Sequence, residues 1–114
     1  MTKKADLLPG TLDMLILKTL TRAPLHGYGI ALSIKNISQD VLTVEEGSLY
    51  PALHRLEKRG LLEAEWGVSP EGRQRKHYQL TALGRKERLA LRKEWTEFTR
   101  AVNLVLGIQY VQLA

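Results

Sequence analysis

The stretch of residues 46–62 constrains the fold of this chain more than any other part of the sequence. Its apolar side chains recur at the i, i+3, i+4 and i+7 spacing that places residues on one face of a helix: Leu49, Ala52, Leu53 and Leu56. Ser48 is a good N-cap residue, and Pro51 would then fall in the first turn, where its missing N–H is tolerated. Lys58 and Gly60 are typical of a helix end. The sequence therefore predicts a short helix with one buried face.

The opposite face of this helix carries aromatic, hydrogen-bonding and basic side chains: Tyr50, His54, Arg55 and Lys58. Such side chains suit the major groove of DNA, where base edges present hydrogen-bond donors and acceptors. The alternative is a charged helix face that is simply solvated. The chain has 17 Lys and Arg residues against 12 Asp and Glu, a net charge of +5 that favours a polyanionic partner, although basic enzymes share it.

Length and composition exclude several classes of protein. A chain of 114 residues is the size of one domain, and its 44% apolar and 25% charged residues are typical of globular rather than disordered proteins. The absence of cysteine excludes disulfides and thiolate metal sites. Pro9, Gly10 and Asp13 interrupt the apolar run that follows a polar N-terminal arm. We therefore expect neither a signal peptide nor a membrane span, and place the protein in the cytoplasm.

Two helices are predicted before residue 46. The first has Thr11 as its cap and ends by Pro24, and its buried stripe consists of Leu12, Leu15, Ile16, Thr19 and Leu20. The second begins at His26, and its inner face consists of Ile30, Ala31 and Ile34, with Ile37 as a further candidate. Gly27 and Gly29 weaken this helix, which is acceptable where the backbone closely approaches either a phosphate or a neighbouring helix. Residues 41–44 are β-branched and leucine residues that predict a short strand.

A hairpin is predicted after residue 60. Residues 61–66 alternate, with Leu62, Ala64 and Trp66 on the inner face of a half-buried strand. Residues 69–72 have the Ser, Pro and Gly positions of a β-turn. Residues 75–80 return as a second strand, with Tyr78 and Leu80 pointing inward.

The C-terminal part of the sequence predicts one long helix. Thr81 caps it, and an end near Leu106 gives a length of roughly 40 Å, far longer than the core it leaves. Steps of four, three, four and three residues define an a/d seam: Leu91, Trp95, Phe98, Val102 and Val105. Ala101, Leu104 and Ile108 widen this seam, which we expect to pair with a second copy of the chain.

Several motifs together resemble the PadR transcriptional regulators over nearly the whole chain. Those motifs are Leu8-Pro9-Gly10-Thr11-Leu12, His26-Gly27-Tyr28-Gly29-Ile30, Gly47-Ser48-Leu49-Tyr50-Pro51-Ala52-Leu53-His54-Arg55-Leu56-Glu57, Gly60-Leu61-Leu62, and Arg75-Lys76-His77-Tyr78-Gln79-Leu80-Thr81 with Gly84. The resemblance implies a mainly α fold with a small β-hairpin, a winged helix-turn-helix of residues 1–80, and a dimerisation helix of residues 81–114. The single C-terminal helix is similar to that of the short subfamily.

The resemblance also implies which side chains face double-stranded DNA. In the 46–62 helix these are the first-turn residues Ser48, Tyr50 and Pro51, and His54, Arg55 and Lys58 continue the same face. The hairpin adds Arg73, Arg75 and Lys76, with Gln74 as a weaker candidate. Tyr28 is expected either to reach a phosphate or to pack under the hairpin, and His26 to cap or pack locally.

Trp95 admits two interpretations. A tryptophan in a dimer seam usually contributes packing. In some short PadR relatives, however, a tryptophan of the C-terminal helix stacks on flat aromatic, often cationic, compounds, and here Trp95 and Phe98 would form such a ligand site with help from Glu94.

No catalytic constellation, cofactor motif or metal-ligand spacing occurs in the sequence, so we expect neither an enzyme nor a metalloprotein. We expect a homodimeric transcriptional regulator that acts as a repressor and binds a palindromic operator. The alternatives are a sensor of small aromatic effectors with DNA as its readout, and a winged helix that contacts only proteins.

Overall fold

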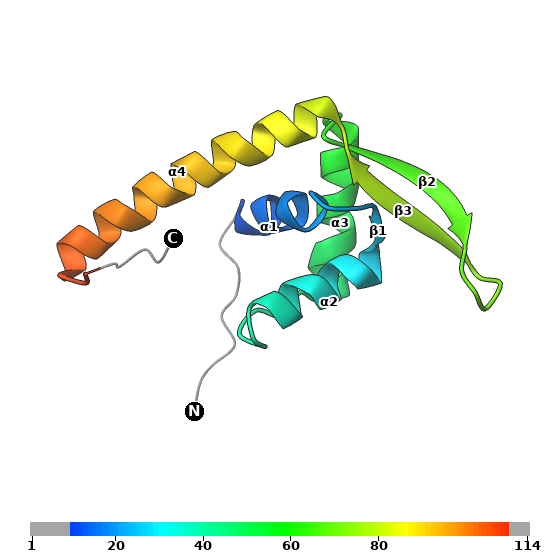
Figure 1. The fold of residues 1–114 in the computed structure, drawn as a ribbon, viewed down its shortest axis with the longest axis horizontal. Helices are drawn as coiled ribbons and strands as arrows, with labels where there is room; N and C mark the ends of the chain where they lie inside the picture. Colours follow the sequence, from blue (N-terminus) through cyan, green and yellow to red (C-terminus); the bar gives the residue numbers. More distant parts are fainter. Residues whose placement is uncertain (1–9, 110–114) are drawn as a thin grey trace.

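A computed structural model describes residues 10–109, in which four helices and three short strands follow one another (Figure 1). The order is α1 (Thr11–Thr19), β1 (Leu25–His26), α2 (Gly27–Ile37), α3 (Glu46–Lys58), β2 (Leu62–Val68), β3 (Gln74–Leu80) and α4 (Ala82–Leu106). This is the predicted winged helix-turn-helix with a long C-terminal helix. The N-terminal arm predicted at residues 1–9 lies outside the described residues. No helix in the described part of the chain is both long and apolar enough to span a membrane.

The sheet is antiparallel and has the strand order β1-β3-β2. In the hairpin, Leu62 pairs with Leu80 and Val68 with Gln74. The third strand is β1, whose Leu25 pairs with Tyr78. The strand predicted at residues 41–44 is wrong, because this segment is a loop. There the backbone N–H of Leu42 donates to the Ser38 hydroxyl at 3.0 Å instead of to a neighbouring strand.

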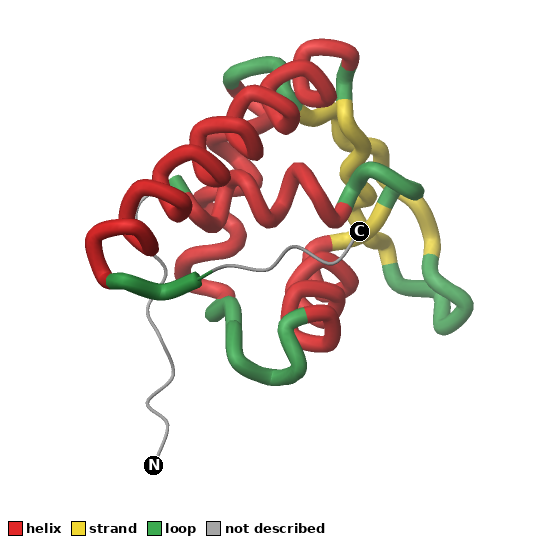
Figure 2. The backbone as a smooth tube through the Cα atoms, turned by 60° about the vertical axis from the view of Figure 1, so that its left-hand side comes forward, coloured by secondary structure: helices red, strands yellow, loops and turns green. Residues whose placement is uncertain are grey.

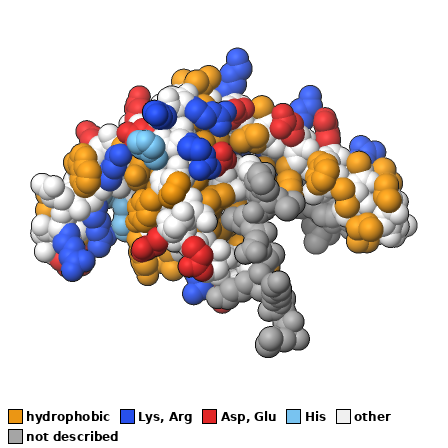
Figure 3. All heavy atoms as spheres, turned by 180° about the vertical axis from the view of Figure 1, so that it is seen from behind, with side chains coloured by type: hydrophobic (Ala, Val, Ile, Leu, Met, Phe, Trp, Pro, Cys, Tyr) orange, Lys and Arg blue, Asp and Glu red, His pale blue; other side chains and the backbone are white. Residues whose placement is uncertain are grey.

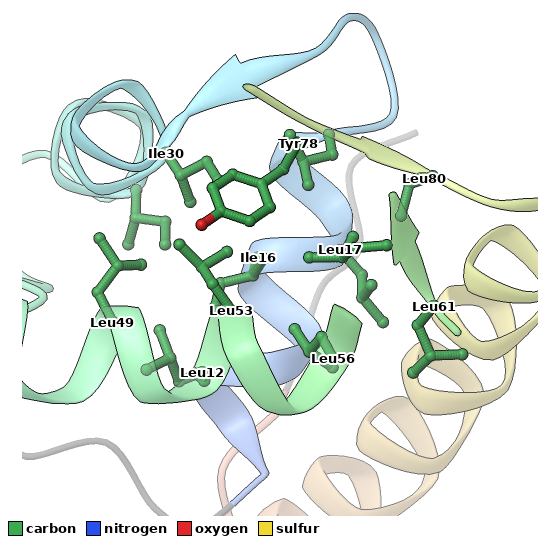
Figure 4. Packing of buried hydrophobic residues seen from close by; sticks show 14 residues of the cluster. Leu12, Ile16, Leu17, Ile30, Leu49, Leu53, Leu56, Leu61, Tyr78 and Leu80 are labelled. Atoms are coloured by element: carbon green, nitrogen blue, oxygen red, sulfur yellow. The ribbon is translucent and has the colours of Figure 1, made fainter. Parts of the chain in front are cut away.

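The core lies between α1, α2, α3 and the inner face of β3. Figure 4 shows Ile16, Leu53 and Tyr78 pointing toward one another from α1, α3 and β3. The predicted inner residues Ile30, Ile34 and Leu80 are buried. Ile37 is 76% exposed, so its predicted inner position is wrong: it is the last residue of α2 and lies beyond the core. Leu17 is buried in the same cluster as Leu61 and Leu80, outside the stripe predicted for the first helix: the buried set of α1 and its C-cap is Leu12, Ile16, Leu17 and Leu20.

Helix α1 begins one residue earlier than its predicted cap implies. Gly10, with φ of 86°, occupies the N-cap position, and Thr11 is the first helical residue. The predicted role of Thr11 as a cap is therefore wrong, and no side chain caps this end. A left-handed φ of this size is the conformation that glycine adopts without a steric penalty.

Helix α4 leaves the core at its N-terminal end and passes beside α1 (Figures 1 and 2). Thr81 caps it as predicted, since the N–H of Gly84 donates to the Thr81 hydroxyl at 2.9 Å. The same hydroxyl donates to the carbonyl of Gly60 at 2.6 Å, which ties the end of α3 to the start of α4. Gly84 is buried against the backbone of Leu61, and a Cβ at this position would overlap the Leu61 carbonyl oxygen.

Candidate nucleic-acid interface

Helix α3 has the predicted buried face and a different beginning. It starts at Glu46 with Glu45 at the N-cap, and the N–H groups of Ser48 and Leu49 both donate to the Glu45 carbonyl, at 3.0 and 2.9 Å. The predictions that Ser48 caps the helix and that Pro51 lies in its first turn are therefore wrong. The extra turn is possible because Glu46 places negative charge at the positive end of the helix dipole.

The end of α3 matches the prediction. Gly60 has φ of 77° and follows the C-cap residue Arg59. The N–H of Leu61 donates to the Leu56 carbonyl, and that of Gly60 to the Glu57 carbonyl, both at 3.0 Å. This is a Schellman motif, in which a left-handed glycine turns the chain out of the helix.

The two faces of α3 divide as the spacing predicts. The apolar face is buried: Leu49, Ala52, Leu53 and Leu56. The side chains predicted to face DNA are all exposed: Ser48, Tyr50, Pro51, His54, Arg55 and Lys58. A polar, aromatic and basic surface therefore runs along the whole length of this helix.

Arg55 has an intramolecular partner on this surface. Its Nη2 lies 3.2 Å from Oδ1 of Asp13 in α1, while 59% of the Arg55 side chain stays exposed. An exposed pair of this kind contributes less than about 1 kcal/mol. Asp13 therefore orients the guanidinium without holding it away from an incoming ligand.

The close approach at Gly27 is to a side chain. A Cβ built on Gly27 would lie 2.8 Å from Cε1 of Tyr50, so the ring of Tyr50 sits against the first residue of α2. This contact favours the packing interpretation of Gly27 over the phosphate interpretation. It also fixes the Tyr50 ring, which is 46% exposed, between α2 and α3.

The hairpin β2–β3, which we call the wing, is closed by the predicted turn. The N–H of Gly72 donates to the Ser69 carbonyl at 2.9 Å, and the Ser69 hydroxyl accepts from the N–H of Arg73 at 3.1 Å. Arg73 and Gln74 are exposed beyond this turn. Figure 3 shows Lys and Arg side chains at the end of the wing, at the left of the view.

Arg75 and Lys76 are half-buried and bind other parts of the protein. Nη1 of Arg75 lies 3.2 Å from Nε2 of His26, which must accept because a guanidinium only donates. Burial, then the positive charge of Arg75 and the neighbouring His77, lowers the pKa of His26. Nζ of Lys76 lies 2.9 Å from Oε1 of Glu57 in α3, and this hydrogen bond raises the pKa of Lys76.

His26 precedes α2 without a side-chain capping bond. Its ring packs instead near Tyr28 and His77, with centroid distances of 6.1 and 5.8 Å. The packing interpretation of His26 is therefore confirmed, and the capping interpretation is wrong. In the described part of the chain, no group of three or more His, Asp or Glu side chains is arranged to hold a metal ion.

Trp66 does not lie in the core, and its predicted inward position is wrong. It shares a face of β2 with Leu62 and Ala64, but 67% of its side chain is exposed. Leu62 and Ala64 pair with Leu80 and Tyr78, whose side chains reach the core, whereas Trp66 pairs with Lys76 farther out on the wing. The strands extend beyond the helices that would cover this face.

An open groove of about 450 Å³ brings several predicted site residues together. It runs between the start of α2, the start of α3 and the wing, and is lined by His26, Gly27, Tyr28, Tyr50, Trp66, Arg73, Gln74, Arg75, Lys76 and Tyr78. His54, Arg55 and Lys58 are not part of the groove and lie farther along α3. His26, Trp66 and Tyr78 are the lining side chains that the sequence did not predict for the site.

The comparisons with known proteins agree with this geometry. The family model of the PadR-like transcriptional regulators matches residues 16–90. This chain belongs to the PadR-like family. Among solved structures, a transcriptional regulator from Clostridium thermocellum is similar, with a TM-score of 0.79, 28% identity, and coverage of 87% of this chain and 96% of that one. A PadR family regulator from Clostridium difficile has a TM-score of 0.75 and 31% identity, covering 86% and 100% of the two chains.

Relatives by sequence include the following two proteins. An uncharacterised protein of Lysinibacillus sphaericus is 33% identical over 103 residues, which cover 90% of this chain and 94% of that protein. A transcriptional regulator of Mycobacterium tuberculosis is 40% identical over 68 residues, which cover 60% of this chain and 63% of that protein. The predicted family and fold are confirmed, and this PadR-like chain is a DNA-binding transcriptional regulator.

In this PadR-like chain, the predicted seam of α4 is largely open to solvent. Leu91 and Val102 are half-buried, whereas Trp95, Phe98 and Val105 are 41%, 58% and 88% exposed. The rings of Trp95 and Phe98 are neighbours, with centroids 6.3 Å apart. Figure 3 shows hydrophobic side chains gathered on the outer end of α4, at the right of the view.

A second pocket lies beside Trp95, between α1 and α4. It is lined by Met14, Leu15, Lys18, Arg88, Arg92 and Trp95. Phe98 is not among these lining residues. The three basic side chains disfavour cations, so the pocket suits a neutral or anionic compound better than a cationic one.

Proposed function

We propose that this chain is a homodimeric repressor that acts in the cytoplasm on a palindromic DNA operator. Residues 1–80 would form the DNA-binding domain, with α3 in the major groove and the wing against the adjacent backbone. The observation that carries this proposal is the single exposed face of α3, on which Tyr50 adjoins the groove that also holds Arg73 and Arg75. Bases and phosphates are the targets that such a combination of side chains fits.

Dimerisation through residues 81–114 is supported by the exposed apolar side chains of α4. Isolated exposed apolar residues are ordinary, but a row of them along one long helix marks an interaction site. A two-fold axis through paired α4 helices would place two α3 helices about one DNA turn apart, near 10 bp, or a multiple of that.

The experiment is a footprint on the DNA upstream of the gene that encodes this chain, followed by affinity measurements on the protected site. Replacing Arg73 and Arg75 together by alanine should weaken binding and reduce the salt dependence, since removing one phosphate contact lowers the slope by about one. No retention of duplex DNA by the unaltered protein would reject the proposal in favour of a winged helix that contacts only proteins.

A small aromatic effector is a second proposal, which the pocket beside Trp95 favours. Planar anionic and neutral dyes should quench tryptophan emission more strongly than planar cationic dyes. Trp95→Ala should remove the quenching. Equal quenching in Trp95→Ala protein would place the dye elsewhere.

A further inference from the structure

Trp66 is a large aromatic side chain that the fold leaves in solvent. It lies on the groove side of the wing, 67% exposed, and lines the same groove as Tyr28 and Tyr50, which are 64% and 46% exposed. One exposed aromatic residue needs no explanation, because much of any protein surface is apolar. Three exposed aromatic rings that line one groove, from α2, α3 and β2, indicate a binding surface.

The charge of the groove indicates the class of ligand. Arg73, Arg75 and Lys76 line it, and no Asp or Glu occurs among its described lining residues. Glu57 neutralises Lys76 from one side. The hydrogen-bond partner of Arg75 is the ring of His26, which brings no negative charge. The groove is therefore aromatic and cationic, which suits a polyanion that also offers flat or apolar surface.

The strand that carries Trp66 is linked to α3 through its partner strand. Lys76, which pairs with Trp66 across the hairpin, is bound to Glu57 in α3 at 2.9 Å. On the α2 side of the groove, the Tyr50 ring rests on Gly27. These contacts favour the arrangement in which Trp66 and Tyr50 line the same groove.

We propose that Trp66 contacts the sugar–phosphate backbone of one DNA strand as that strand passes between α3 and the wing. The faces of the bases in an intact duplex are covered by stacking, so the indole would pack on a deoxyribose and donate its N–H to a phosphate oxygen. Trp66 then positions the wing without reading sequence. This inference rests on the proposed DNA-binding function and adds to it a contact that carries no charge.

The test uses a mixed-sequence duplex of roughly 30 bp at about 50 mM salt, because the contact does not depend on sequence. Trp66→Ala should weaken binding about fivefold or more, Trp66→Phe less, and neither should change the slope of affinity against salt. Arg73→Ala should lower that slope. Ile37→Ala is the control, because it removes an apolar side chain that is 76% exposed at the far end of α2. It should leave the affinity within about twofold.

Tryptophan emission supplies an independent readout. The duplex should change the emission of the unaltered protein and lower its quenching by acrylamide, and Trp66→Phe should abolish most of both effects although Trp95 remains.

The inference would be overturned if the Trp66 variants bound the duplex with unchanged affinity and still showed the DNA-dependent change in emission. If Arg73→Ala weakened binding in the same assay, the DNA-binding function would remain. A change in sedimentation without a change in DNA affinity would also overturn it, and would assign Trp66 to a protein contact. No binding of the duplex by the unaltered protein would overturn both proposals.

Discussion

Arg55 combines an exposed position with a defined orientation. Its partner Asp13 belongs to α1 and has a side chain that is 17% exposed. This ion pair directs the guanidinium across the surface of α3. Because the pair is exposed and weak, DNA can exchange it for a base edge or a phosphate at small cost. Arg59 is a natural comparison, since it makes a similar pair with Glu87 at 2.9 Å and is 53% exposed.

We expect Arg55→Ala to weaken binding to the footprinted operator by about 1–3 kcal/mol and to change the free energy of unfolding by less than about 1 kcal/mol. Fluorescence anisotropy and denaturant titration measure the two quantities. Arg59→Ala serves as the control, with a similar effect on stability and a smaller one on operator affinity. An equal loss on random DNA would show that Arg55 holds a phosphate and reads no base.

His26 makes the stability of the fold depend on pH. Its pKa in the folded protein lies below the ordinary value of 6.5, since the ring is partly desolvated and faces Arg75 and His77. Above about pH 6.5 the ring is neutral in both states, so its contribution is fully present. As pH falls below that value the unfolded chain binds a proton that the folded chain resists, and stability declines until the folded ring also protonates.

The free energy of unfolding of the unaltered protein should therefore fall between about pH 7 and pH 5 more steeply than that of His26→Gln. Glutamine retains an acceptor for Arg75 but does not titrate. Chemical denaturation at a series of pH values measures both slopes. Identical slopes would show that His26 is not desolvated in solution.

Two residues illustrate what the sequence can predict at this scale. The alternation of β2 correctly places Trp66 on the face of Leu62 and Ala64, but a period of two residues does not say where the core ends. The contact between Gly27 and Tyr50 joins residues far apart in the chain, and no local pattern links them. Tyr50 and Trp66 both line the groove. The sequence predicted Tyr50 for the site but not its contact with Gly27, and it did not predict Trp66 for the site, because both depend on tertiary packing.

At the scale of elements, the junction between α3, β2 and α4 depends on backbone packing. Gly84 lies in the first turn of α4, against the backbone of Leu61, while Thr81 binds both Gly84 and Gly60. Any side chain at position 84 would push α4 away from the wing and from α3. The orientation of α4 is thus set where the helix begins.

Gly84→Ala should destabilise the fold by on the order of 2 kcal/mol, because a methyl group cannot be accommodated against the Leu61 carbonyl. Gly47→Ala is the matched control: Gly47 is also helical, nothing lies within 4 Å of its missing Cβ, and alanine should stabilise α3 by up to about 1 kcal/mol. Thermal unfolding compares the two. A stabilising Gly84→Ala would contradict this close packing.

The helices and the hairpin were predictable from periodicity and turn residues, and so were the end of α3 and the cap of α4. The starts of α1 and α3 and the smallest strand were not. Ser48 is a preferred cap, yet α3 begins at Glu46 without a side-chain cap, and the acidic first turn stabilises this start. Strand β1 has two residues, too few for any alternation, and exists because β3 offers it a partner. Which residue begins a helix, and whether a two-residue strand forms, is decided by tertiary contacts.

At the scale of the whole molecule, the proposed dimer explains why α4 exposes so much apolar surface. Trp95, Phe98 and Val105 have no covering element among residues 10–109, although the spacing of the seam is that of a coiled coil. A second α4 would bury them. The two DNA-binding units would then act together on one site.

Phe98→Asp should therefore convert the dimer to a monomer, since a carboxylate would have to be buried without a partner. Sedimentation should show the change, and operator affinity should fall because only one α3 helix is then bound at a time. Thr96→Asp places the same charge on the opposite side of α4 and should leave the dimer intact. A dimeric Phe98→Asp protein would show that the seam lies elsewhere.

Because α4 is anchored at Gly84, a small rotation there is amplified along the length of the helix. At 1.5 Å per residue its 25 residues extend roughly 37 Å, so a tilt of about 5° at the pivot displaces the far end by roughly 3 Å. In the proposed dimer, a small change at the far end of α4 would in turn alter the angle between the two DNA-binding units and the spacing of their α3 helices. The close packing of Gly84 against Leu61 would limit how far that angle can vary.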